Sequence, residues 1–335
     1  MTRPKSKDAH ELFLKGERAF NAFRRQKLDE SRGFFEQAIE VERQQFGQPY
    51  PRAMAELVYV LVTIHKQGLH AAEEAAAALE KAGSLAPAAV SADPDDYNNH
   101  WALGFYHAYS GASDGPDNAR QTYQAALQMF NESTDDLERK PALLSDMGDV
   151  LVELGDTGAG LELTWRAVYD VPPWYRWNLA NAFYAAGKFA EARDELDKIG
   201  QRPPVIGQRP ERRLRPNEKG YFYPALPLHA ATLARLKQRK QANDALKAYT
   251  KRVGQPEASK LLMAELLAPP HIFSDRDAKR YHVAWVTDLV AAGALDLLDR
   301  EALRTDFDEL LRQLKLLKIP VPGAERRRSK QTKRK

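Results

Sequence analysis

The chain has 335 residues, of which 43% are hydrophobic and 29% charged. It can therefore bury a sizeable core, and this composition excludes wholesale disorder. It contains no cysteine, which excludes a disulfide framework, thiolate metal sites and a cysteine nucleophile.

The formal net charge of +4 comes from the C-terminal tail. Seven of the last ten residues, Arg326–Lys335, are Lys or Arg, and the remaining body carries 43 basic against 46 acidic side chains. Met1–Lys15 contains no apolar run of signal-peptide length, and no 18-residue apolar stretch occurs elsewhere. We therefore expect a soluble, cytoplasmic protein.

Apolar residues recur at spacings of three and four almost throughout, while strand-like alternation is scarce. Clusters of Gly, Pro, Asn and Asp interrupt this pattern roughly every 12–20 residues. The pattern predicts helices joined by short turns.

Small residues recur in phase in six successive helix pairs. In the first and third pairs, about three extra residues lengthen the link between the two helices. In the second pair, Pro87 is expected to end the second helix. The pairs are marked, in chain order, by Gly16, Ser31, Phe35 and Ala38; by helices over 53–67 and 71–87; by Gly104, Ala119, Tyr123 and Ala126; by residues 140–172; by residues 179–199; and by residues 226–249.

The fourth and fifth pairs resemble the tetratricopeptide repeat, a unit of 34 residues. The fourth has Gly148 and Gly160 at the small positions 8 and 20, and the fifth has Ala180 and Ala192 there. Small residues let the two antiparallel helices approach closely. We predict an all-α fold, a right-handed superhelical solenoid of such hairpins with a helical C-terminal cap. The alternative is a non-repetitive, alanine-rich helical bundle.

Residues 9–16, 275–281 and 289–293 further resemble the ends of tetratricopeptide regions that follow bacterial class III adenylate cyclases or belong to transcriptional regulators. This resemblance implies a sensory or scaffold module without cyclase activity. The predicted regions are a flexible N-terminus (1–8), repeats one to five (9–200), a Pro/Arg-rich loop (201–224), repeat six (225–252), capping helices (253–319) and a disordered basic tail (320–335).

The resemblance implies that the first helix of each repeat lines a concave groove. The corresponding positions combine aromatic rings with acidic and amide groups, and exposed aromatic rings are favoured as binding anchors. The alternative is that these rings only stack between repeats. The predicted groove contacts are Trp101, Phe105, Tyr109, Asp149, Trp174, Trp177, Asn181 and Tyr184.

The Lys, Asn and Arg clamp of chaperone-tail receptors in this family is incomplete here, because Asp146 and Asp149 stand where it would continue. We therefore expect a scaffold that binds a basic or proline-rich, aromatic-containing segment of another protein. The chain's own loop, residues 203–216, has this character, and one hypothesis is that it occupies the groove. The alternatives are a basic docking loop and an inert insertion between repeats five and six.

The alternative function is nucleic-acid association, in which the basic tail contacts phosphates or another anionic surface. Such binding should weaken steeply with salt. Alternatively, the tail is only a solubilising segment. The tail residues concerned are Arg326, Arg327, Arg328, Lys330, Lys333, Arg334 and Lys335.

Motifs of catalysis are nearly absent. The string Gly111–Gly115 matches G-x-S-x-G, but it follows a predicted helix and not the strand that a nucleophile elbow requires. His100 and His107 share a helical face without a third ligand at metal spacing. We predict no enzymatic activity, no metal and no cofactor.

Overall fold

The computed structural model describes residues 4–20, 25–67, 70–132, 140–167, 173–199, 224–267 and 276–321. These residues form an all-α fold, with no strand among them. The chain divides into two compact units, Met1–Leu143 and Leu144–Lys335. No helix in the described part of the chain is long and apolar enough to cross a membrane.

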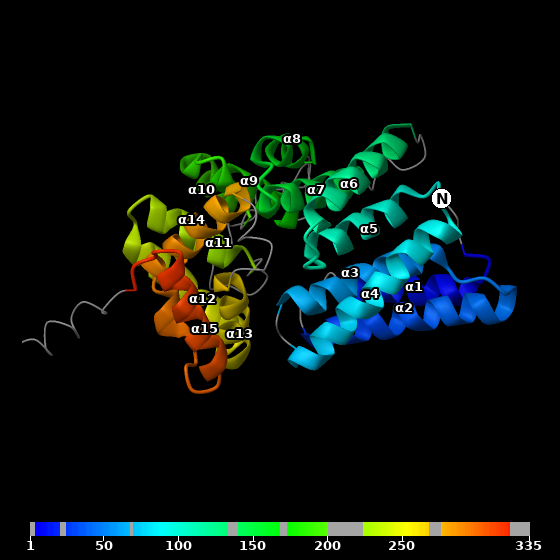
Figure 1. The fold of residues 1–335 in the computed structure, drawn as a ribbon, viewed down its shortest axis with the longest axis horizontal. Helices are drawn as coiled ribbons and strands as arrows, with labels where there is room; N and C mark the ends of the chain where they lie inside the picture. The colour runs from blue at the N-terminus through cyan, green and yellow to red at the C-terminus, as the bar shows by residue number, and fades with distance from the viewer. Residues whose placement is uncertain are drawn as a thin grey trace, which may run out of the picture. The chain divides into compact units, whose positions relative to one another are not determined.

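In its described part, the first unit consists of three successive hairpins (Figure 1). In the first and third hairpins, a glycine of one helix lies under an aromatic ring of the other. A Cβ atom built on Gly16 would lie 2.6 Å from Cε1 of Phe35, and one on Gly104 would lie 2.5 Å from Cε1 of Tyr123. The helices are α1 (Lys7–Phe20), α2 (Arg25–Phe46), α3 (Pro51–Gln67), α4 (Ala72–Ala92), α5 (Tyr97–Tyr109) and α6 (Gly115–Glu132).

The second helix of the second hairpin differs from the prediction. Pro87 does not end α4, which continues to Ala92 before Asp93 closes it with a bond to the Ala89 carbonyl. The partner helix α3 is buried almost all round, as expected of a helix in the centre of a unit.

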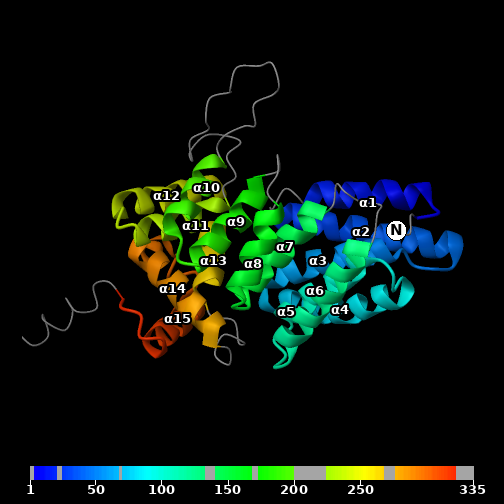
Figure 2. The same ribbon diagram turned by 90° about the horizontal axis from the view of Figure 1, so that it is seen from above.

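The second unit begins inside α7 (Lys140–Glu153) and continues with hairpins of the same kind (Figure 2). The backbones of α7 and α8 approach closely at Gly148 and Gly160, where a Cβ atom on Gly148 would lie 2.8 Å from the Gly160 carbonyl oxygen. The other elements are α8 (Thr157–Ala167), α9 (Pro173–Ala185), α10 (Phe189–Lys198), α11 (Ala225–Arg235), α12 (Arg239–Val253), α13 (Gln255–Leu266), α14 (Arg276–Ala292), the 3-10 helix η2 (Ala294–Leu297) and α15 (Arg304–Leu316).

In the described part of the second unit, the same turn follows the first helix of three hairpins, α7–α8, α9–α10 and α11–α12. The turn residue has a positive φ, which is 89° at Gly155, 76° at Gly187 and 64° at Lys237. Each turn residue and its successor donate backbone hydrogen bonds to the last turn of the preceding helix. This is the Schellman closure, which normally takes glycine. Together with the close glycine contacts, it gives these hairpins the packing expected of tetratricopeptide repeats.

Candidate functional site: the first-helix faces

The three aromatic side chains predicted on α5 lie together in one cluster. Phe105 stacks on Tyr59 of α3 with ring centroids 4.2 Å apart, and Trp101 meets the same tyrosine edge-on at 4.8 Å. Tyr109 packs edge-on against Phe105 at 5.0 Å. Phe105 is only 8% exposed, whereas Trp101 and Tyr109 are half-buried. Phe105 therefore differs from the exposed contact that the repeat register predicts, because Tyr59 covers it.

A cation borders this cluster. Lys66 Nζ donates a hydrogen bond of 2.8 Å to the Tyr109 hydroxyl, and it also lies 4.5 Å from the centre of the Tyr109 ring. Sequence reasoning missed both Lys66 and Tyr59. Their spacing of seven residues on α3 was the signal available, since it places them on one helical face.

The predicted residues of the second unit form another group. Trp174 and Trp177, at the start of α9, are half-buried. Asn181, one helical turn further on, is 8% exposed and donates a hydrogen bond of 2.8 Å to Asp149 Oδ1 on α7. Tyr184 is 2% exposed. Both Asn181 and Tyr184 thus differ from the open groove contacts expected from the sequence.

The burial of Asn181 and Tyr184 is caused by α14, which packs on the face of α9 that carries them. Tyr281 donates a hydrogen bond of 2.7 Å to Asn181 Oδ1, and Trp285 meets the Tyr184 ring edge-on with centroids 5.7 Å apart. α14 also packs against α11, the first helix of the next hairpin. The sequence predicts this helix as part of the C-terminal cap, and the structure shows it in contact with the predicted groove residues Asn181 and Tyr184 of α9.

A buried ionisable group lies where α14 meets the two first helices. The Tyr184 hydroxyl donates a hydrogen bond to Asp288 Oδ2, and Arg235 Nε donates to the same oxygen at 2.9 Å. Burial raises the pKa of Asp288, and the interactions with Tyr184 and Arg235 partly oppose this increase. Burial and the Asp288 charge raise the pKa of Tyr184, so its hydroxyl keeps its proton and remains a donor.

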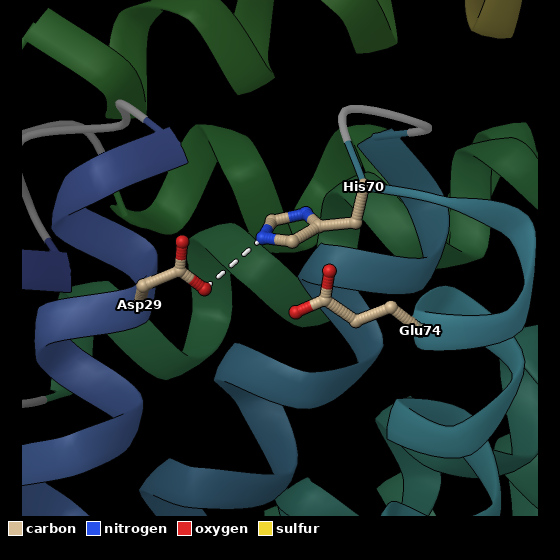
Figure 3. A group of neighbouring side chains, drawn as sticks. All are labelled: Asp29, His70 and Glu74. Atoms are coloured by element: carbon tan, nitrogen blue, oxygen red, sulfur yellow. Dashed lines mark hydrogen bonds and ion pairs between the residues drawn. The ribbon is translucent and has the colours of Figure 1, made fainter.

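A second group of polar side chains lies in the first unit (Figure 3). His70, just before α4, points toward Asp29 of α2, with Nε2 3.1 Å from Oδ1, and Glu74 of α4 lies beside them. Arg32 lies within 3.4 Å of Glu74 and 3.5 Å of Asp29. Because this guanidinium already compensates the two carboxylates, the group is an ion-pair network and gives no reason to expect a cation.

The other predicted features fall in several places. α5 precedes Gly111 and α6 begins at Gly115, so the G-x-S-x-G string joins two helices, as expected for a turn. Tail residues Arg326–Lys335 and loop residues 203–216 lie outside the described residues. The predicted groove residues on α5 belong to the first unit, and those on α7 and α9 belong to the second unit. The two sets are therefore treated as separate surfaces.

No protein-family model matches this chain, and no curated protein matches it either. Among solved structures, the chain is similar to PilF of Pseudomonas aeruginosa, with 18% identity, 70% of this chain and 93% of that chain covered, and a TM-score of 0.39. It is similar to a chain of the Naa15/Naa10 complex bound to HypK-THB, with 17% identity and a TM-score of 0.32. This match covers 91% of this chain and 42% of that chain. A third similar structure is the P58(IPK) TPR domain, with 11% identity and a TM-score of 0.22. This match covers 92% of this chain and 98% of that chain.

The assignment of repeats in this chain rests on the hairpin packing described above. The resemblance to the regions associated with adenylate cyclases and transcriptional regulators stays a prediction.

Proposed function

We propose that this chain is a protein-interaction scaffold, which binds a segment of another protein along the first helices of its hairpins and carries out no chemistry. One observation carries the proposal. The first-helix face of the second unit already holds a helix, the chain's own α14, through Asn181, Tyr184 and Arg235.

The chemistry of this face favours a basic, aromatic-containing segment. Trp174 and Trp177 are half-buried on α9. Asp149 and Glu153 are acidic residues of α7, and Asp149 is joined through Asn181 to Tyr281 of the bound helix. A few anchor residues, often aromatic, carry most of the binding energy in such sites, while acidic groups attract basic partners and disfavour acidic ones.

Affinity capture with paired variants tests this function. Each of two double variants removes the two half-buried aromatic side chains that were predicted as groove contacts in one unit. The variants are Trp101→Ala with Tyr109→Ala, and Trp174→Ala with Trp177→Ala. We expect at least one of them to lose the proteins that the unaltered chain captures, while circular dichroism shows unchanged helical content.

The matched control is Trp165→Ala. Trp165 is 61% exposed but lies on α8, the second helix of its hairpin. Capture should survive this substitution. If both double variants capture the same proteins as the Trp165 variant, the first-helix faces are not the binding surface.

A further inference from the structure

Two polar contacts fasten α14 across the first-helix face of the second unit. At one, the Tyr281 hydroxyl donates to Asn181 Oδ1 at 2.7 Å, and Asn181 Nδ2 in turn donates to Asp149 Oδ1 at 2.8 Å. This chain of bonds joins α14 to α9 and α7. Asn181 uses both ends of its amide, so its orientation is determined by its two partners.

At the other contact, a single carboxylate oxygen joins three helices. Asp288 Oδ2 of α14 accepts a hydrogen bond from the Tyr184 hydroxyl on α9 and another from Arg235 Nε on α11, the latter at 2.9 Å. Asp288 is buried. A buried carboxylate is costly unless its bonds are made, so this contact determines which helix fits and in what register.

Between the two contacts lies an aromatic anchor. Trp285 is buried, and its ring lies edge-on to Tyr184 with centroids 5.7 Å apart. Tyr281, Trp285 and Asp288 occupy positions i, i+4 and i+7, which lie on one face of a helix. The preceding residues Lys279 and Arg280 are basic and exposed.

Tyr281 is joined to Asp149 of α7 through Asn181. Burial raises the pKa of Tyr281, and the charges of Glu153 and Asp149 on α7 add to this increase. The basic first turn of α14 is thus the part of the helix next to an acidic part of the wall. Opposite charges at this end favour the observed direction of the helix over the reverse one.

We propose that the face formed by α9 and α11 is a helix-binding site that α14 occupies in the free protein. Its outside ligand is an amphipathic helix with a basic first turn and Tyr, Trp and Asp at the spacing of residues 281, 285 and 288. This ligand replaces α14. The inference rests on the proposed function only in supposing that an outside partner exists.

An outside helix that replaces α14 must overcome the advantage that α14 has as an intramolecular ligand. A tethered helix competes at an effective concentration in the millimolar range for short flexible linkers. α14 therefore acts as an inhibitor of its own site. Weakening its two polar contacts with α9 and α11 should open the face without altering the wall.

A fluorescent peptide with the sequence of Arg276–Ala292 tests the exchange by anisotropy. The full chain carrying Tyr281→Phe and Asp288→Ala loses both of these polar contacts from its internal helix but keeps Asn181, Tyr184 and Arg235. The peptide can still make these contacts. We expect it to bind the variant chain at least about tenfold more tightly than the unaltered chain, because one of the contacts is to a charged group.

The control peptide carries the same two substitutions and should bind the variant chain at least about tenfold more weakly than the natural peptide. Equal binding of the two peptides, equal binding to the two chains, or no binding to the variant would each overturn the proposal. If light scattering shows that the variant instead dimerises, the occupant is a second copy and the outside-helix assignment is wrong.

A measurement on the unaltered chain covers the case in which the variant does not fold. Native-state hydrogen exchange should show α14 opening more readily than α11. Equal protection of the two helices would mean that α14 does not detach from the face independently of the unfolding of α11. Neither experiment uses captured proteins, so capture that survives in both double variants, together with intact peptide exchange, would count against the proposed function alone.

Discussion

Arg52 and Glu56 lie one turn apart on α3, with Nε of the arginine 3.6 Å from Oε1 of the glutamate. They form an ion pair, but the separation is too long for a good hydrogen bond. The Glu56 side chain is 19% exposed. Burial raises its pKa to about 7, Arg52 opposes the shift, and the charges of Glu17 and Asp96 add to it.

This raised pKa predicts that the protein loses stability as the pH rises. Between the ordinary pKa of 4.5 and about 7, folded Glu56 keeps a proton that the unfolded chain has released, so the free energy of unfolding falls across this range. The loss from this group is at most about 3 kcal/mol. Glu56→Gln should flatten the dependence, which urea unfolding at pH 5 and pH 8 would measure.

The matched control for this prediction is Glu11→Gln, at an exposed position on α1. It should leave the dependence of stability on pH as it is in the unaltered chain. A Glu56→Gln chain that loses as much stability between pH 5 and pH 8 as the unaltered chain would contradict the assignment.

Gly148→Ala should destabilise the fourth hairpin. The added Cβ atom would lie 2.6 Å from Thr164 Cγ2 and 2.8 Å from the Gly160 carbonyl oxygen, and α7 and α8 would have to separate. Overpacking of this kind costs about 1–3 kcal/mol. Gly158→Ala, on α8 with no atom within 4 Å of the new Cβ, should instead stabilise by up to about 1 kcal/mol. Thermal unfolding of the two variants measures the contrast, and equal melting temperatures would refute it.

Lys237→Gly should stabilise the second unit. Lys237 has a φ of 64° in the turn position that Gly155 and Gly187 occupy in the two preceding hairpins. Relief of the left-handed strain is worth about 1–2 kcal/mol, and the greater freedom of glycine in the unfolded chain offsets about half of it. We expect a net gain of about 0.5–1 kcal/mol in urea unfolding. The reverse change, Gly187→Lys, should cost a similar amount.

Local features of the fold could be predicted from the sequence. The approach of Gly104 to Tyr123, or of Gly148 to Gly160, depends on residues within one hairpin, so periodicity and small side chains are sufficient to indicate it. The prediction that Pro87 ends the second helix of its hairpin is wrong, because α4 extends beyond the motif length to Ala92. A rule that predicts helix ends from proline alone does not include the packing of the residues beyond it, such as the buried Ala89.

The non-local part of the candidate site could not be predicted in this way. The repeat register placed Asn181 and Tyr184 on the groove wall, and the structure shows both contacting α14. Nothing in the pattern of one repeat indicates that a helix one hundred residues further along will cover the wall. The spacing of Tyr281, Trp285 and Asp288 on one helical face was the available sign.

This long separation also has a consequence for the newly synthesised chain. Contacts inside hairpins are local and form early, whereas a contact between residues 100 apart in the sequence must wait for loop closure. On the ribosome, α9 and α11 emerge and can fold before α14 emerges. Tyr184 and Arg235 are therefore uncovered during translation, and the order of synthesis allows another molecule to reach them before α14 does.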